Sequence, residues 1–274
     1  MHIAILLAGH TNKAMPQRFH DYDDMFTDLF QSLPDGQDFR FSTLPVVNNV
    51  FPDHVNDYNG FLISGSAFGV YDDAPFIPRL MDLVRQICNA KKPLVGVCFG
   101  HQIIAHALGG KAQKWDNGWV LGTKEITLTE LPDWMEEKDW IDTKDNKINL
   151  IHVHQDQVTK LPRKAKLIGT ASHCKNAVFV IGDTVFAVQG HPEFDVPYTE
   201  ALTGLLEDLA GKRRVNAARK SLSTPHDGRR VAAWILKFFS RHKPARHKRT
   251  SDKSFTSYQI AKNENNQNVT RNRP

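Results

Sequence analysis

The sequence has few cysteines and no long apolar run. Cys88, Cys98 and Cys174 are the three cysteines among 274 residues. An odd number without a paired spacing argues against a disulfide framework or a cysteine-based zinc site. The apolar run at residues 3–8 is too short for a signal-peptide core or a membrane span. These absences predict a cytoplasmic protein that makes no membrane contact.

An excess of positive charge is also absent from most of the chain. The formal net charge is +5, but residues 241–274 hold nine Lys or Arg and two acidic residues, against 26 basic and 28 acidic residues before them. We expect residues 1–242 to form one domain and residues 243–274, which are polar and lack apolar periodicity, to be disordered. A solvated extension is the interpretation that we favour for this tail, over an arm that docks an acidic partner or nucleic acid.

A strand, a sharp turn and a helix centred on Cys98 form the strongest local pattern. The apolar run 94–97 predicts a buried strand, and the segment after it has helical length and ends at Gly109-Gly110. Gly96 and Gly100 would let the strand and the helix approach closely around a strained cysteine. The adjacent helix N-terminus favours the thiolate. A core cysteine needs no flanking glycines, so we interpret Cys98 as a nucleophile.

Strands alternate with helices in the first half of the chain. The expected strands lie at residues 3–8, 39–44 and 61–63, and the expected helices at 22–30 and 76–90. This alternation predicts an α/β, doubly wound, mostly parallel sheet with flanking helices, whose ligands bind beyond the carboxyl ends of its strands. After Gly110, short β patterns separated by turns predict an antiparallel extension. Two further helices are expected, at residues 198–210 and 229–239.

A second buried run, residues 185–189, ends at a histidine. His191 can accept the Cys98 proton, and Glu193, across a turn stiffened by Pro192, can hold the histidine ring and stabilise its charged form. The three residues would form a nucleophile, a base and an orienting carboxylate. The alternative is a His-Pro turn with a solvated glutamate.

Two stretches resemble the motifs of class I glutamine amidotransferases, namely Gly96-Val97-Cys98-Phe99-Gly100-His101-Gln102 and Gln189-Gly190-His191-Pro192-Glu193-Phe194. The resemblance covers roughly residues 1–240 and implies the flavodoxin-like fold and Cys-His-Glu triad of that family. It implies that Cys98 attacks the glutamine side-chain amide or a γ-glutamyl bond, and that water hydrolyses the resulting glutamyl thioester. Neither a metal nor an organic cofactor is expected.

The resemblance also implies an oxyanion hole. The loop from Ser64 to Asp72 is similar to the glycine-rich oxyanion segment of the family. The backbone N–H groups of Gly65, Ser66 and Phe99 are therefore expected to bind the oxyanion. Many members carry a second glycine where this chain has Ser66. An ordinary strand-to-helix turn is the alternative interpretation of this loop.

The segment from Ile151 to Val158 resembles the part of the family that contacts the α-amino and α-carboxylate groups of the substrate. The residues implied are Val153, His154, Gln155 and Asp156, where members commonly have Ser-His-Gly-Asp. Gln102, one helical turn after Cys98, is expected to hydrogen bond the same head group. His152 and His154 share one face of a strand. We expect no metal site, because no third ligand appears at a recognisable spacing.

Three functions remain open at this point. The chain resembles the glutaminase domain of GMP synthase, which would serve a separate ammonia-accepting synthetase, and it resembles the free-standing γ-glutamyl peptidases. A catalytically silent binding or regulatory module is the third possibility, and the intact triad argues against it. The sequence contains no nucleotide-binding loop or ATP-pyrophosphatase motif, so it is not a complete GMP synthase. The expected substrate is glutamine or a γ-glutamyl small molecule.

Overall fold

The computed structural model describes residues 1–135 and 146–243. Its strands are β1 (His2–Leu6), β2 (Arg40–Leu44), β3 (Gly60–Ile63), β4 (Leu94–Val97), β5 (Lys111–Lys114), β6 (Val120–Leu128), β7 (Lys147–His154), β8 (Asp156–Lys160), β9 (Ala165–Ala171), β10 (Cys174–Ile181) and β11 (Val185–Val188). Its α-helices are α1 (Tyr22–Gln31), α2 (Phe76–Asn89), α3 (Phe99–Ala107), α4 (Val196–Leu205), α5 (Glu207–Ala210), α6 (Lys212–Ser221) and α7 (Gly228–Ser240). Short 3-10 helices are η1 (Pro34–Asp38), η2 (Val46–Asn48), η3 (Val55–Asp57) and η4 (Asp133–Met135).

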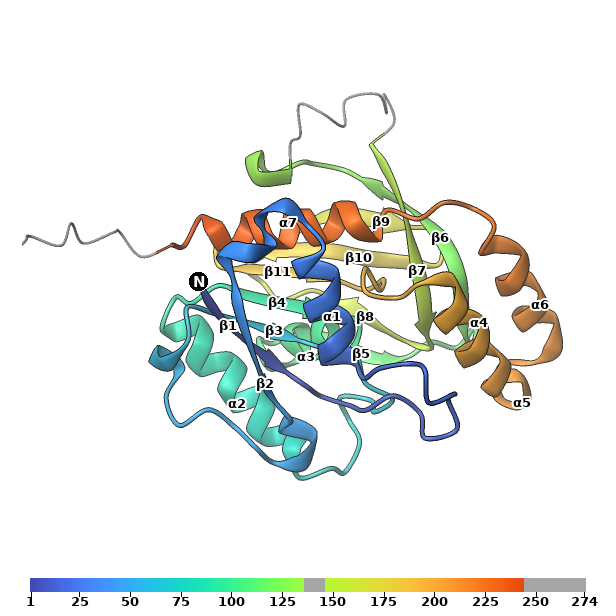
Figure 1. Ribbon diagram of the computed structural model, residues 1–274, viewed down its shortest axis with the longest axis horizontal. Helices are drawn as coiled ribbons and strands as arrows, with labels where there is room; N and C mark the ends of the chain where they lie inside the picture. Colours follow the sequence, from blue (N-terminus) through green and yellow to red (C-terminus); the bar gives the residue numbers. More distant parts are fainter. Residues whose placement is uncertain (136–145, 244–274) are drawn as a thin grey trace, which may run out of the picture. The chain divides into compact units, whose positions relative to one another are not determined.

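The described strands form one large sheet and one small ribbon (Figure 1). The order in the nine-stranded sheet is β2-β1-β3-β4-β11-β10-β9-β6-β7. The first five strands pair in parallel, and every later pairing is antiparallel. β5 and β8 pair antiparallel in the ribbon. The expected α/β class is confirmed, with a parallel half and an antiparallel extension.

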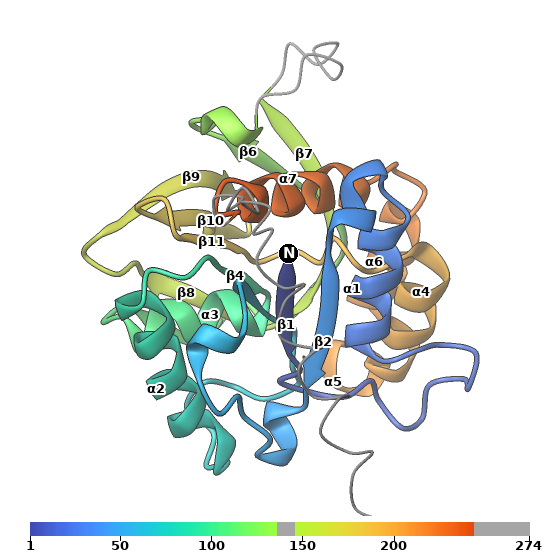
Figure 2. The same cartoon turned by 60° about the vertical axis from the view of Figure 1, so that its left-hand side comes forward.

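Helices cover both faces of the parallel half, as a doubly wound sheet requires (Figure 2). In β1, Ile3 and Ile5 point into the core beneath α1 and α7, whereas Ala4 and Leu6 point into the core beneath α2 and α3. Successive side chains of a strand face opposite sides of its sheet, and here both sides are buried. This two-sided burial explains why the strand sequences are continuously apolar rather than alternating.

The segment after residue 195 differs from the sequence expectation. The single helix expected over 198–210 is divided, because α4 ends at Leu205 and α5 begins at Glu207. The sequence did not predict α6, where Val215 and Ala218 are the buried residues, so its apolar stripe is short. α6 packs closely on β6, where a Cβ on Gly122 would lie 2.9 Å from Cα of Ala218.

Two further expectations from the sequence concern the C-terminal tail and the membrane. Residues 244–274, which make up all but the first residue of the expected disordered tail, lie outside the described residues. Among the described residues, no helix combines the length and the apolar character that crossing a membrane requires.

Candidate active site

Cys98 occupies the turn between β4 and α3, and its backbone is strained. Its φ of 53° and ψ of −102° lie in a region that residues with a Cβ rarely adopt. A Cβ on Gly96 would come within 2.5 Å of the Gly100 carbonyl oxygen, and a Cβ on Gly100 would collide with the Ile63 carbonyl oxygen. Both glycines are therefore needed for the close approach of β3, β4 and α3. The sharp turn at Cys98 is the one that the sequence predicts.

His191 lies beyond the end of β11, in contact with both Glu193 and Cys98. Its Nδ1 is 2.7 Å from Oε1 of Glu193, and both side chains are buried. The imidazole also hydrogen bonds the Cys98 sulfur and stacks on the Phe194 ring, with centroids 3.9 Å apart. Burial alone lowers the pKa of His191, but the negative charges of Glu193 and Cys98 outweigh burial and raise this pKa to about 10. The ring is held in its protonated form beside the sulfur.

The antiparallel extension holds the backbone of His191. The His191 N–H donates to the Ile151 carbonyl oxygen over 2.8 Å, and these two residues form an isolated antiparallel bridge. Ile151 belongs to β7, which is four strands away from β11 in the sheet order. The position of His191 thus depends on both halves of the sheet.

The loop after β3 lies beside the cysteine and the histidine. A Cβ on Gly65 would lie 3.0 Å from Cε1 of His191 and 3.9 Å from Cβ of Cys98. The Ser66 hydroxyl donates to the Ala8 carbonyl oxygen over 2.9 Å. Ser66 therefore ties this loop to the segment that follows β1. The expected oxyanion residues Gly65, Ser66 and Phe99 are brought next to Cys98 by β3 and by the start of α3.

A cavity of about 450 Å³ opens beside these residues. Cys98 and His191 line it, whereas Glu193 lies behind the histidine ring. The cavity is also lined by most of the other residues expected from sequence, namely Ser66, Gln102, Val153, His154, Gln155 and Asp156. The structure therefore places the expected substrate-contacting residues around one space next to the thiol.

Gln102 lines this cavity, but its amide nitrogen is bonded within the protein. Nε2 of Gln102 donates to the Asp156 carbonyl oxygen over 2.9 Å and to Oε1 of Gln189 over 3.3 Å. The expected contact of this nitrogen with a substrate head group competes with those two bonds. In this structure the side chain ties α3 to the start of β8.

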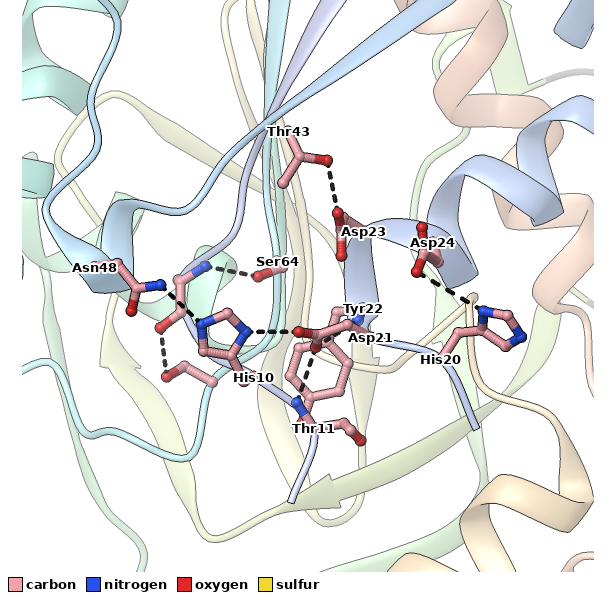
Figure 3. Close-up of polar contacts among 12 residues, drawn as sticks. His10, Thr11, His20, Asp21, Tyr22, Asp23, Asp24, Thr43, Asn48 and Ser64 are labelled. Atoms are coloured by element: carbon pink, nitrogen blue, oxygen red, sulfur yellow. Dashed lines mark hydrogen bonds and ion pairs between the residues drawn. The ribbon is translucent and has the colours of Figure 1, made fainter. Parts of the chain in front are cut away.

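Several residues that sequence reasoning missed also line the cavity, among them His10, Asn12, Tyr71, Asp72, Lys114 and Trp119. Figure 3 shows how His10 is oriented in the loop after β1: its Nδ1 is 2.6 Å from Oδ2 of Asp21, and its Nε2 is 3.3 Å from Nδ2 of Asn48. His10 and Asn12 have no periodic pattern, and the signal available for them was position, because their loop follows the carboxyl end of a parallel strand. Tyr71 and Asp72 belong to the loop that was compared with the oxyanion segment.

The mouth of the cavity carries charged groups. Burial raises the pKa of Asp156, whose carboxylate hydrogen bonds the Tyr71 hydroxyl. Oδ2 of Asp72 accepts a hydrogen bond from the Gly69 N–H over 2.8 Å. Lys114 lines the same cavity from β5. The site thus offers carboxylates and one ammonium group, which match the charges of an amino-acid head group.

The spacing argument against a third histidine ligand does not hold in three dimensions. One ring nitrogen from each of His152, His154 and His173 lies within 4.8 Å of the other two. His173 comes from the turn between β9 and β10, so its proximity depends on strand pairing and is invisible in the local sequence.

Comparison with known proteins identifies the family. A family model described as "Glutamine amidotransferase class-I" matches residues 38–201. This match covers more than half of the chain and includes Cys98, His191 and Glu193. The chain belongs to the class I glutamine amidotransferase family.

The chain has similar relatives with different described activities. Gamma-glutamyl peptidase 3 of Arabidopsis thaliana is 30% identical over 194 residues, which cover 70% of this chain and 76% of the relative. A glutamine amidotransferase-like protein of Schizosaccharomyces pombe is 29% identical over 254 residues, covering 86% and 98%. The glutamine-hydrolysing GMP synthase of Porphyromonas gingivalis is 30% identical over 170 residues, but the match spans only 31% of that enzyme.

Solved structures share the fold. A glutamine amidotransferase from Thermotoga maritima has a TM-score of 0.67 and 21% identity, covering 88% of this chain and 98% of the other. A glutamine amidotransferase from Methylobacillus flagellatus has a TM-score of 0.66 and 19% identity, covering 88% and 94%. The fold expected from the resemblance is confirmed.

Proposed function

We propose that this chain hydrolyses an amide bond at the γ-carbonyl of a glutamyl group, with Cys98 as nucleophile, His191 as acid and base, and Glu193 as the orienting carboxylate. The observation that supports it is the position of the His191 ring, which is buried between the Glu193 carboxylate and the Cys98 sulfur at one cavity. A buried imidazolium needs a nearby anion, and a thiolate beside it is the reactive form of cysteine.

In the first step the Cys98 thiolate attacks the γ-carbonyl carbon. The oxyanion then accepts hydrogen bonds from backbone N–H groups, which we assign to Phe99 and to Gly65 or Ser66. When the carbon–nitrogen bond breaks, His191 donates its proton to the departing nitrogen, and ammonia or an amine leaves. A glutamyl thioester remains on Cys98, and the histidine is neutral.

In the second step a water molecule attacks the thioester carbon. Neutral His191 takes a proton from this water as the oxygen–carbon bond forms. The carbon–sulfur bond then breaks, glutamate is released, and the thiolate and protonated histidine are regenerated. Glu193 keeps Nδ1 of His191 occupied over 2.7 Å, so Nε2 faces the reaction.

The residues from β7 and β8 are assigned to the substrate head group. Val153, His154, Gln155 and Asp156 line the cavity on the side formed by the antiparallel extension. We propose that Asp156 binds the α-amino group and that the neighbouring backbone groups bind the α-carboxylate. Gln102 acts on this segment through its bond to the Asp156 carbonyl oxygen, and is a positioning residue.

Two substrates fit this chemistry. Glutamine is the simplest, and its hydrolysis would release ammonia, either to water or to a separate synthetase such as the one suggested by the GMP synthase relative. A γ-glutamyl peptide or conjugate is the second candidate. Its specific support is the cavity of about 450 Å³, which falls in the ~300–1,000 Å³ range of sites that enclose drug-sized ligands. The match to gamma-glutamyl peptidase 3 agrees with this second candidate.

A substrate panel tests the proposal. The wild-type chain and Cys98→Ala would be incubated with glutamine, glutathione and γ-glutamyl amino acids, and release of ammonia, amine and glutamate would be measured. Release by the wild type and none by Cys98→Ala is expected, and the preferred substrate identifies the leaving group. Turnover that persists in Cys98→Ala would refute the nucleophile. No turnover of any compound by the wild type would favour a catalytically silent binding module.

A further inference from the structure

Three histidines from two separate segments form a cluster beside the proposed active site. His152 and His154 alternate along the end of β7, and His173 lies in the two-residue turn that joins β9 to β10. The His152 and His173 rings are nearly perpendicular, with centroids 4.7 Å apart and an interplanar angle of 84°. One nitrogen of each of the three rings lies within 4.8 Å of the other two. We call this group the histidine cluster.

The hydrogen bonds define which nitrogens carry protons. Nδ1 of His154 is 3.0 Å from the Asp156 carbonyl oxygen, and a carbonyl can only accept, so Nδ1 is the donor. Nε2 of His154 is then an acceptor for Nδ1 of His152, which lies 3.1 Å away. Nε2 of His152 and Nε2 of His173 are buried and have no hydrogen-bond partner within the described part of the chain. Of these two nitrogens, Nε2 of His173 is on the side of the cluster where a bound ion would supply the missing partner.

The protonation state also suits a metal ligand. Burial lowers the pKa of His152 well below its ordinary value, that of His154 to about 3 and that of His173 to about 4. All three rings are therefore neutral near pH 7, which is the form of imidazole that binds a metal ion.

We propose that His152, His154 and His173 bind one divalent transition-metal ion, with Zn²⁺ as the reference ion and a water molecule as the fourth ligand. Imidazole ligands select zinc, copper and nickel over magnesium and calcium. His154 already has the orientation of a metal-bound histidine, because its other nitrogen donates to a backbone carbonyl. The ligand atoms would be Nδ1 of His152, Nε2 of His154 and Nε2 of His173.

The geometry needs one small movement. Tetrahedral bonds of ~2.0–2.1 Å place ligand nitrogens about 3.4 Å apart, and the His152 and His154 nitrogens are already 3.1 Å apart. The His173 nitrogen lies within 4.8 Å of the other two, so it must approach by at most about 1.4 Å. Rotation of this turn side chain can supply that movement while Gln157 holds the His173 carbonyl oxygen at 2.7 Å. The proton on Nδ1 of His152 moves to Nε2 of the same ring, which is buried and has no acceptor within the described part of the chain. This unsatisfied N–H lowers the expected affinity for the ion.

Charge and access set the expected affinity. Lys124 on β6 lies near His152 and His173, and its ammonium group disfavours a second positive charge there. We therefore expect weaker binding than at structural zinc sites. His154 lines the 450 Å³ cavity and His173 lines a neighbouring cavity of about 280 Å³. Residues of the histidine cluster therefore border both cavities.

The test is calorimetric titration of the full chain with zinc chloride in a Cys98→Ser background, where the reactive thiol cannot contribute. One ion per chain is expected. His173→Gln should weaken binding at least about tenfold, Lys124→Met should strengthen it, and His20→Gln, which changes an exposed histidine, should leave it unchanged. Equal affinity in the parent and in His173→Gln, or no effect of Lys124→Met, would overturn the assignment. If His173→Gln does not fold, as judged by its melting temperature without metal, His173→Ala replaces it.

Cobalt spectroscopy separates this site from the proposed nucleophile. Co²⁺ bound to wild type should give the visible absorption of a four-coordinate nitrogen and oxygen site without a thiolate charge-transfer band. A charge-transfer band that disappears in Cys98→Ser would instead place the metal on the catalytic thiol and overturn the proposal. Both readouts are independent of turnover, so the metal site and the proposed function can fail separately.

Discussion

The parallel and antiparallel halves of the sheet contribute to the cavity in different ways. In the parallel half, Gly65, Cys98 and His191 each follow the carboxyl end of a strand, after β3, β4 and β11. In the antiparallel extension, residues 153–156 lie at the corner between β7 and β8, with His173 at the tip of a neighbouring hairpin. The proposed reacting groups therefore come from adjacent strand ends, and the proposed substrate-binding groups come from a corner.

This difference has energetic consequences. A strand end in a buried parallel sheet cannot shift without disrupting two cores, so it can hold a strained residue such as Cys98. The corner of the extension is tied to the parallel half by hydrogen bonds such as that of Gln102 to the Asp156 carbonyl oxygen. We expect substitutions in the parallel half to lower kcat, and substitutions in the corner to raise KM.

The largest expected effect in the parallel half is the loss of the nucleophile. Cys98→Ala should lower kcat/KM by at least about 10⁴-fold, because no other group can form the thioester. Cys88→Ala and Cys174→Ala are the controls, since burial raises the pKa of these thiols to about 11 and about 12 and keeps them protonated. Labelling by a thiol-directed glutamine analogue should map to Cys98. Labelling of Cys88 or Cys174 would contradict the assignment.

The next prediction compares the loss of kcat at His191, the proposed base, with the loss at Glu193, its proposed orienting partner. His191→Asn should lower kcat by about 10³-fold, and Glu193→Gln by only about 10- to 100-fold, because the carboxylate orients the ring and does not itself transfer the proton. Steady-state kinetics on the preferred substrate measure both values. Small and equal losses would mean that another histidine acts as base, and His154 at the same cavity is the nearest candidate.

The raised pKa of His191 predicts a pH-dependent stability. This pKa rises from 6.5 to about 10 on folding, so the stabilisation is complete below about pH 6.5 and is lost as the pH rises toward about 10. The loss should amount to at most about 5 kcal/mol in the free energy of unfolding. Denaturant titrations of the wild-type chain at several pH values would measure it. Glu193→Gln should flatten the curve, and an equally steep curve in that variant would contradict the ion pair.

The corner of the extension should respond differently. Asp156→Asn should raise KM about tenfold and leave kcat within about threefold, because it removes a charge used in binding and keeps the side-chain shape. Asp183→Asn, at an exposed turn, is the matched control and should change neither constant. If Asp156→Asn lowers kcat with KM unchanged, the proposed division between the two halves is wrong.

The smallest expected effect concerns the tail. Truncation after Lys243 should leave kcat/KM for a small substrate within about twofold, because the removed residues lack the apolar pattern needed to pack on a domain. A large loss would show that the predicted boundary at residues 242–243 is misplaced. Binding to RNA and DNA would be compared for the full and truncated chains at increasing salt. Salt-sensitive binding that needs the tail would favour a docking arm.

The sequence by itself determined the parallel half and the motifs that carry the proposed reacting groups. The steric demands around Cys98 are met by neighbours in the chain, namely Gly96 and Gly100, and so they leave a contiguous pattern. His191, the proposed acid and base, and Glu193, its proposed orienting residue, are likewise separated only by Pro192. Buried strands also show directly in composition, because two apolar faces require a continuous apolar run.

Only the tertiary structure decided which distant residues meet. The bridge from His191 to Ile151, the bonds of Gln102 and the entry of His173 into the histidine cluster all depend on strand register and loop path. Residues that meet in this way need not share any spacing along the chain. Their positions follow from the packing of the antiparallel extension against the parallel half, which single-chain periodicity does not encode.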